Sequence, residues 1–310
     1  MKRSNHILLV IAGPTAVGKT DLCINLAKKF NTAIISADSR QFFREMDIGT
    51  AKPGKDVLAQ VTHYFIGNKS IHQPYDVRDF EQDALDMMER LFKEHELLIL
   101  TGGSGLYLDA LVKGLDEMPS IDPEIRDKLN CEYRQFGLPY LQQQLALLDP
   151  AYYQQVDLQN PQRLIRALEV CLGTGRPYSD FRKKRKSPRF FRSIKIALDR
   201  ERQELYDRID RRMDEMIRQG LFSEAESLYP YRHLNALQTV GYKEVFGFLE
   251  GSYDREEAVR LLKRNSRRYA KRQLTWFRKD PDYTWFHPND WEQMLQWIGD
   301  RVKEGDDQKD

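Results

Sequence analysis

The sequence contains little of what marks a secreted, membrane-bound or disordered protein. It has only three cysteines in 310 residues, Cys23, Cys131 and Cys171, which are far apart and outside any CxxC motif. A disulfide framework or structural zinc site is therefore not expected, and all three are predicted to be buried small side chains. No apolar run approaches the roughly 20 residues of a membrane helix, and residues 1–9 are too short and polar for a signal peptide. We therefore expect a cytoplasmic protein with no membrane partner, and nothing indicates an obligate protein partner.

The net charge is only +2, but basic residues gather in residues 182–192 and 263–279. Such stretches can meet a polyanion on one face of a protein, or they can be solvated helix faces. Both interpretations stay open on charge alone. A hydrophobic content of 41% excludes a disordered chain. The length favours two domains, or one large domain with an insert.

Strands, glycine turns and helices alternate over the first part of the chain. Residues 6–12 form a continuous apolar run, which is typical of a strand buried on both faces. Further strands are predicted at 32–36 and 96–101, and helices at 21–30, 75–95 and 106–112. This rhythm predicts an α/β fold, namely a P-loop NTPase-like parallel sheet with helices on both faces.

The rhythm changes after Gly114, because residues 119–187 contain no convincing strand. Short helices are predicted there at 123–136, 139–148 and 161–172. A strand at 193–198 then returns to the sheet, followed by long helices at 200–229 and 254–277. We predict that residues 1–118 and 188–310 form a catalytic core with C-terminal helices, and that residues 119–187 form a mainly helical insert domain.

The most specific local signal is a phosphate-binding loop. Residues 13–20, GPTAVGKT, fit G-x-x-x-x-G-K-[ST] at every fixed position and lie between a buried strand and a helix. The loop N–H groups and the helix N-terminus favour an anion, while the lysine and threonine suit a terminal phosphate and Mg²⁺. The predicted diphosphate-binding residues are Gly13, Pro14, Thr15, Ala16, Val17, Gly18, Lys19 and Thr20, with Thr20 as the metal ligand.

A P-loop predicts polyphosphate binding but not ATP hydrolysis. Many such enzymes place a metal-binding Asp at the end of a neighbouring strand, whereas the strand here ends at Thr101. The available carboxylate is Asp38, after the second strand. It could hold Mg²⁺ or accept a proton from a nucleophile, or it could only cap a helix or turn.

Seven segments, in order, resemble the tRNA dimethylallyltransferase family, also called isopentenyl-tRNA transferases. They are residues 13–20 (GPTAVGKT), 35–41 (ISADSRQ), 46–53 (MDIGTAKP), 102–107 (GGSGLY), 160–169 (NPQRLIRALE), 240–242 (VGY) and 270–278 (AKRQLTWFR). The resemblance runs over nearly the whole chain. It implies transfer of a dimethylallyl group from dimethylallyl diphosphate to the exocyclic amine of the adenosine 3′-adjacent to the anticodon, with Mg²⁺ as cofactor.

The resemblance also implies roles for single residues. Asp38 becomes the catalytic carboxylate that takes the amine proton, together with Lys19 and Thr20 at the leaving group. The implied contacts with the anticodon stem-loop of tRNA are Asp38, Ser39, Arg40, Gln41, Ser104, Arg126, Gln162, Arg163, Leu164, Ile165, Arg166, Gln238, Thr239, Val240, Gly241, Tyr242 and Lys243. Many relatives carry a small or apolar residue in place of Arg40 and a threonine in place of Ser104.

Several of these residues have a second interpretation. Arg163 and Arg166 lie one turn apart near a helix start, where guanidinium groups oppose the helix dipole unless an anion is near. That anion is either RNA or an internal partner such as Glu169. Tyr242 could stack on a base or belong to the core. Arg208 and Arg212, one turn apart, are further candidates for the diphosphate.

Two rival functions share parts of this pattern. An ATP-dependent small-molecule or nucleotide kinase would use the same loop and sheet, but it predicts an Asp where Thr101 stands. A non-catalytic RNA-binding protein with a relic P-loop predicts the loss of Lys19, Thr20 or Asp38, and all three are present.

Overall fold

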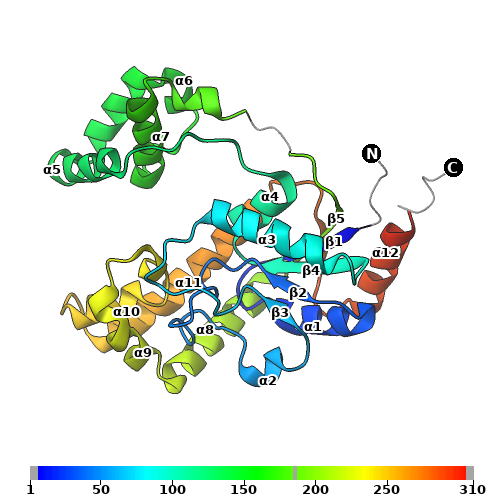
Figure 1. The fold of residues 1–310 in the computed structure, drawn as a ribbon. Helices are drawn as coiled ribbons and strands as arrows, with labels where there is room; N and C mark the ends of the chain where they lie inside the picture. Colours follow the sequence, from blue (N-terminus) through cyan, green and yellow to red (C-terminus); the bar gives the residue numbers. More distant parts are fainter. Residues whose placement is uncertain (1–5, 184–186, 305–310) are drawn as a thin grey trace. The chain divides into compact units, whose positions relative to one another are not determined.

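The computed structural model describes residues 6–183 and 187–304. The chain divides into two compact units, which are Met1–Lys113 with Pro188–Asp310, and Gly114–Ser187 (Figure 1). Lys184, Arg185 and Lys186, part of the first basic stretch, lie outside the described residues. No helix within the described ranges is long and apolar enough to cross a membrane.

A parallel sheet forms the centre of the larger unit. In the described part of the chain it has six strands in the order β3-β2-β4-β1-β5-β6. The strands are β1 (Ile7–Ala12), β2 (Ile34–Ser36), β3 (His63–Tyr64), β4 (Leu97–Gly102), β5 (Arg192–Leu198) and β6 (Thr284–Phe286). The predicted α/β fold is confirmed. Sequence analysis missed the two edge strands β3 and β6, because they are short and only half-buried.

Helices make up most of the rest of the chain. The α-helices are α1 (Lys19–Phe30), α2 (Lys55–Leu58), α3 (Val77–Leu91), α4 (Gly105–Lys113), α5 (Pro123–Leu148), α6 (Pro150–Tyr153), α7 (Pro161–Thr174), α8 (Arg202–Gln219), α9 (Leu221–Leu228), α10 (Lys243–Leu249), α11 (Arg255–Phe277) and α12 (Trp291–Lys303). Short 3₁₀ turns lie at Tyr178–Phe181, Tyr229–Tyr231 and Asn235–Leu237.

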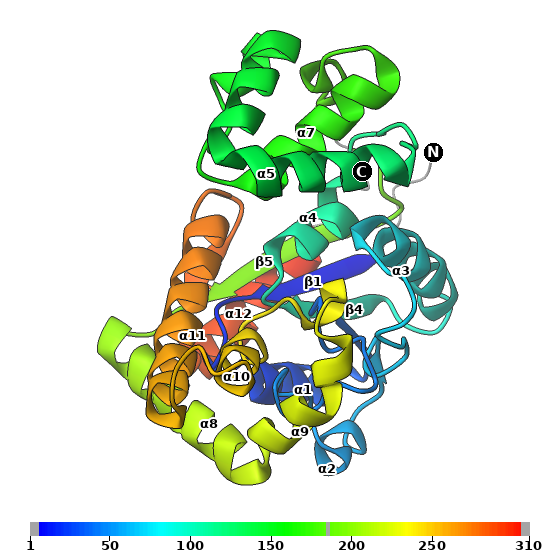
Figure 2. The ribbon, with the colours of Figure 1, turned by 90° about the vertical axis from the view of Figure 1, so that its left-hand side faces the viewer.

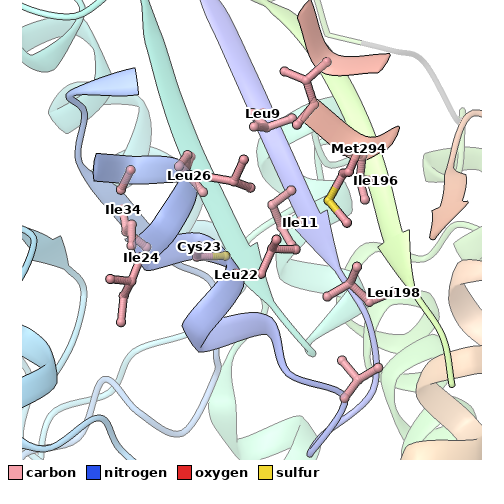
Figure 3. Packing of buried hydrophobic residues seen from close by; sticks show 14 of the residues in the cluster. Leu9, Ile11, Leu22, Cys23, Ile24, Leu26, Ile34, Ile196, Leu198 and Met294 are labelled. Carbon is pink, nitrogen blue, oxygen red and sulfur yellow. The ribbon is translucent and has the colours of Figure 1, made fainter. Parts of the chain in front are cut away.

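The central strand β1 is buried on both faces. Leu9 and Ile11 pack with α1 and α12 on one face, as Figure 3 shows around Met294. Leu8 and Val10 pack with α3 and α4 on the other. Because both faces are covered, the strand needs apolar residues at every position, which accounts for the continuous run in the sequence.

Helices α8 to α11 form a further layer of the larger unit (Figure 2). The single helix predicted over 200–229 is wrong, because the chain is interrupted at Gly220. This glycine has φ 106° and ends α8, and α9 starts directly after it. A left-handed residue cannot continue an α-helix, and glycine adopts that conformation at little cost. The interruption lets Met216 and Leu221 enter one core with Tyr242.

The smaller unit is helical, with its own core around Leu141, Leu145 and Leu164. Gly137, at φ 75°, interrupts α5 between the two helices predicted from the sequence. Helix α7 begins as expected, because the Asn160 side chain accepts a hydrogen bond from the Arg163 N–H and proline follows at the first position. Cys171 is buried as predicted, but Cys131 is exposed, so that prediction is wrong for one of the three cysteines.

Candidate active site

The P-loop joins β1 to α1 at the carboxyl end of the sheet. Gly13 and Gly18 have φ values of 151° and 111°, which side chains disfavour. A side chain at Gly13 would also place its Cβ 3.0 Å from the carbonyl oxygen of Leu198 on β5. The two glycines therefore allow the loop to turn tightly against the sheet.

Lys19 folds back across the loop that it ends. Its Nζ donates to the carbonyl oxygens of Gly13 at 2.9 Å and Pro14 at 2.8 Å. Burial lowers the pKa of Lys19 to about 8, and the Asp38 carboxylate opposes that shift. The neighbouring Thr20 is exposed and lines the same cavity. An anion in the loop would add a second negative charge close to this ammonium.

Three arginines contact the P-loop. Arg200 Nε donates to the Val17 carbonyl oxygen and Arg208 Nε to that of Ala16, both at 2.8 Å. Arg212 Nη1 lies 3.5 Å from Thr15 Oγ1. Burial lowers the pKa of both Arg208 and Arg212. These contacts fix the loop at the N-terminus of α1, where the helix start favours an anion.

Asp38 follows β2, next to β4 and the P-loop. Its Oδ1 accepts a hydrogen bond from the Arg40 backbone N–H at 3.0 Å. The carboxylate is half-buried and lines the cavity that also contains Lys19 and Thr20, with a volume of about 590 Å³. The carboxyl ends of parallel strands meet at one edge of a sheet, so residues from distant segments share one cleft.

Residues after Asp38 are tied to neighbouring loops. The Ser104 Oγ accepts from the Ser39 N–H and donates to the Ser39 Oγ, both at 3.1 Å. The Arg40 guanidinium donates to the Asn235 carbonyl oxygen at 3.0 Å. The Gln41 amide donates to the carbonyl oxygens of Thr50 and Ala51. Arg40 and Gln41 both line the cavity.

The segment 238–243 divides between cavity wall, core and surface. Thr239, Val240 and Gly241 line the cavity, while Gln238 and Lys243 are exposed. Tyr242 is fully buried, and its hydroxyl donates to Glu224 Oε1 at 2.6 Å. It therefore has no open ring face in this structure, which corrects the expectation of base stacking in favour of a core residue.

In the smaller unit, the predicted tRNA contacts likewise divide between exposed and buried residues. Gln162 and Arg163 are exposed, whereas Leu164 and Ile165 are fully buried in the core of that unit and cannot meet a partner. Their inclusion among the contacts is corrected by their burial.

An internal partner exists for two basic residues of the smaller unit. The Arg166 guanidinium pairs with Glu169, which is 3% exposed, and Arg126 Nη1 lies 3.3 Å from the same carboxylate. The alternative of an internal salt bridge therefore applies to Arg166. Both arginines remain partly exposed, so the pairing does not remove them from the surface.

The second basic stretch, on α11, is likewise divided. Lys263 pairs with Asp214 and Arg267 with Asp210, both on α8. Arg268, Lys271 and Arg272 are exposed. The paired residues join two helices, and the exposed ones stay available to a polyanion.

Sequence analysis missed three residues at the site. Arg200 holds the P-loop, and Tyr269 and Gln273 of α11 line the cavity. Burial raises the pKa of Tyr269 to about 12. Each is far in sequence from the residues that it meets, and only the segment 270–278 gave any signal.

Fold and site together define a P-loop protein of the parallel α/β class, in which the phosphate loop and a carboxylate share one cavity. The family model described as IPP transferase matches residues 41–280. The chain therefore belongs to the IPP transferase family.

Curated and solved relatives agree with this family. A tRNA dimethylallyltransferase of Christiangramia forsetii is 54% identical over 91% of this chain and 93% of its own length. The crystal structure of a tRNA isopentenylpyrophosphate transferase from Bacillus halodurans is 36% identical, with a TM-score of 0.73 over 99% of both chains. A eukaryotic dimethylallyltransferase acting on tRNA is 25% identical, with a TM-score of 0.75 over 93% of this chain and 75% of its own.

Proposed function

We propose that the protein is a tRNA dimethylallyltransferase, which moves a dimethylallyl group from dimethylallyl diphosphate to the exocyclic amine of the adenosine 3′-adjacent to the anticodon. The observation that carries this proposal is that the P-loop and Asp38 line one cavity. One end can hold a diphosphate while the other presents a base to a proton acceptor. The family of the chain supports the same chemistry.

The kinase alternative lacks its metal-binding carboxylate. At the end of β4, Thr101 donates its hydroxyl to the Ile11 carbonyl oxygen at 3.1 Å and joins two strands. A threonine in that place cannot supply the negative charge that such kinases use on Mg²⁺. We therefore favour a diphosphate as leaving group over ATP as phosphoryl donor.

At the leaving-group end, positive charge is concentrated around the loop. Lys19, Arg208 and Arg212 line the cavity together with Thr20. As the allylic carbon–oxygen bond breaks, its electron pair stays on the diphosphate, and these groups stabilise the growing charge. Neither arginine can release its proton, so their charge is constant through the reaction.

The donor set fits Mg²⁺ as the cofactor. The described residues contain no group of three His, Cys, Asp or Glu side chains arranged for a metal. Mg²⁺ instead favours one or two protein oxygens, substrate phosphates and water. Thr20 would hold it, with Asp38 in the same cavity. When bound, the ion would neutralise charge on the diphosphate.

At the acceptor end, Asp38 acts as the base. The amine nitrogen forms the new bond to the allylic carbon and gives a proton to the Asp38 carboxylate, which restores a neutral amine. A base inside a stacked anticodon loop cannot reach this cavity, so we expect the adenosine to be flipped out at a cost of a few kcal/mol.

Outside the cavity lining, the exposed residues Gln162, Arg163, Gln238 and Lys243 are further proposed tRNA contacts, and so are the half-buried Ser39 and Ser104. Arginine and lysine would meet phosphates, which fixes orientation and not sequence. With Arg126 and Arg166 they would offset the cost of flipping. Because tRNA and dimethylallyl diphosphate are the proposed substrates, we place the protein in the cytoplasm.

A transfer assay tests the proposal. Wild type, Asp38→Asn and the exposed control Asp56→Asn are incubated with labelled dimethylallyl diphosphate, Mg²⁺ and unmodified tRNA, and a parallel reaction contains ATP. We expect label on tRNA from wild type and control, and a loss of about 10²–10⁴-fold in Asp38→Asn, as is typical for removal of a general base. Phosphate transfer from ATP, with no label on any tRNA, would establish the kinase instead.

A further inference from the structure

A buried glutamine joins the two ends of the cavity. Gln273 lies on α11 and is 6% exposed. Its Oε1 accepts from the Thr15 N–H at 2.9 Å, and its Nε2 donates to the Gly103 carbonyl oxygen at 2.8 Å. One amide thus bridges the P-loop and the turn between β4 and α4, and both of its hydrogen-bonding groups are used.

The backbone around Gln273 is shaped to receive it. A Cβ at Gly103 would lie 2.2 Å from Gln273 Nε2, and a Cβ at Gly105 would lie 2.3 Å from Trp276 on the same helix. Real Cβ atoms do not approach so closely, so the two glycines let α11 lie directly against this turn. The turn has no room for both a side chain and the amide in its present place.

The two hydrogen-bond partners of the Gln273 amide belong to the two substrate sites of the cavity. Thr15 belongs to the loop that would hold the diphosphate, and its N–H is occupied by Gln273 instead of an anion. Gly103 precedes Ser104, whose hydroxyl holds Ser39 next to Asp38. The amide is therefore the middle of a continuous path from the leaving-group loop to the catalytic carboxylate.

We propose that Gln273 is a positioning residue, which sets the P-loop and the Asp38 segment in register for in-line transfer. The inference rests on the proposed function. It predicts that removing the Gln273 amide lowers the rate of transfer more than it lowers the affinity for the substrates. The reason is that a shift of about 1 Å at a reacting centre can cost up to about a hundredfold in rate.

The test uses Gln273→Met, which keeps the length of the side chain but loses both hydrogen bonds. Transfer is measured by single turnover and steady state, and binding of inorganic diphosphate by calorimetry. The matched control is Gln293→Met on α12, where the glutamine is exposed. We expect kcat to fall at least tenfold in Gln273→Met, while KM for tRNA and the affinity for diphosphate stay within about threefold of wild type.

A second variant keeps the inference testable if Gln273→Met folds poorly. Gly103→Ala leaves Gln273 in the sequence but displaces its amide, so it should lose kcat in the same way. The double variant should lose little more than either single one, because both remove the same contact. Losses that multiply would show that the two positions act independently and would overturn the inference.

The remaining outcomes separate the two claims. An inactive wild type would refute the proposed function and the inference with it. An active wild type with unchanged kcat in Gln273→Met would refute the inference alone. A loss confined to thermal stability, with normal kcat in the folded fraction, would reduce Gln273 to a structural residue.

Discussion

Glu224 holds a whole turn of the cavity wall by its carboxylate. Its Oε2 accepts from the backbone N–H groups of Asp47 and Ile48 at 3.0 and 2.7 Å, and its Oε1 accepts from the Gly49 N–H and the Tyr242 hydroxyl at 2.8 and 2.6 Å. Three of these partners are backbone N–H groups that can only donate, and they are divided between the two oxygens, so a carboxylate satisfies all of them and an amide cannot. We predict that Glu224→Gln is markedly destabilising although it preserves size and shape.

The magnitude follows from this donor count. With the NH₂ in place of Oε2, it faces the N–H groups of Asp47 and Ile48; in place of Oε1, it faces the Gly49 N–H, while the Tyr242 hydroxyl can rotate to accept from it. One or two hydrogen bonds to a charged group are therefore lost, at roughly 1.5–3 kcal/mol each. Glu224 is half-buried, so water recovers part of that, and we expect about 2–3 kcal/mol in the free energy of unfolding. At about 2–4 °C per kcal/mol, the melting temperature should fall by about 5–10 °C.

Thermal unfolding followed by circular dichroism measures this change. Glu226→Gln is the control, because Glu226 is exposed two residues further along α9. Tyr242→Phe removes only one of the four donors and should cost about 1 kcal/mol. If Glu224→Gln melts within 1 °C of the Glu226→Gln control, the carboxylate does not hold the turn and the reasoning fails.

The remaining predictions concern the site and the smaller unit. Because burial holds the pKa of Lys19 near 8, inorganic diphosphate should bind more weakly as the pH rises through 8. The Lys19→Met variant should bind diphosphate weakly at both ends of that range, with little change between them. Calorimetry at pH 7 and pH 9 measures the affinity of both proteins. The pKa of Lys19 in the folded protein lies below its value in the unfolded chain. The unliganded protein should therefore gain stability from this group as the pH rises above 8, because the unfolded chain then binds more protons. A loss of stability attributable to Lys19 in that range would contradict the assignment. In the smaller unit, Leu164→Ala should cost about 2–5 kcal/mol of stability because it empties a fully buried position. Arg163→Ala, one residue earlier and exposed, should weaken tRNA binding with an unchanged melting temperature. Filter binding over a salt series measures the affinity for tRNA, and thermal unfolding measures the stability of both variants. If both variants changed affinity and stability to the same extent, the assignment of Leu164 to the core and Arg163 to the tRNA surface would be contradicted.

The P-loop could be predicted from the sequence because its requirements are local. The P-loop needs glycines at two positions of positive φ, a buried strand before it and a helix after it, and all of these leave marks within one short segment. Asp38 was found for a related reason, because a polar residue directly after a parallel strand must lie at the carboxyl edge of the sheet.

The tertiary structure decided which residues of each motif face the cavity. The segment 238–243 reads as one contact motif, yet Tyr242 is buried while Thr239 lines the cavity. In the same way, Leu164 and Arg163 are neighbours with opposite surroundings. The sequence pattern identifies a segment, but the packing of the helix or turn determines which of its residues are exposed.

The sequence by itself determined the fold class, the phosphate loop, the carboxylate after the second strand and the family to which the chain was expected to belong. Only the tertiary structure revealed that Arg200 and Arg208 hold the carbonyls of the loop, and that Gln273 bridges it to a second turn. These side chains lie 170 to 258 residues along the chain from the positions that they contact. Local propensity acts over a few residues, whereas these contacts exist only because the fold brings the segment after β5, α8 and α11 against the P-loop.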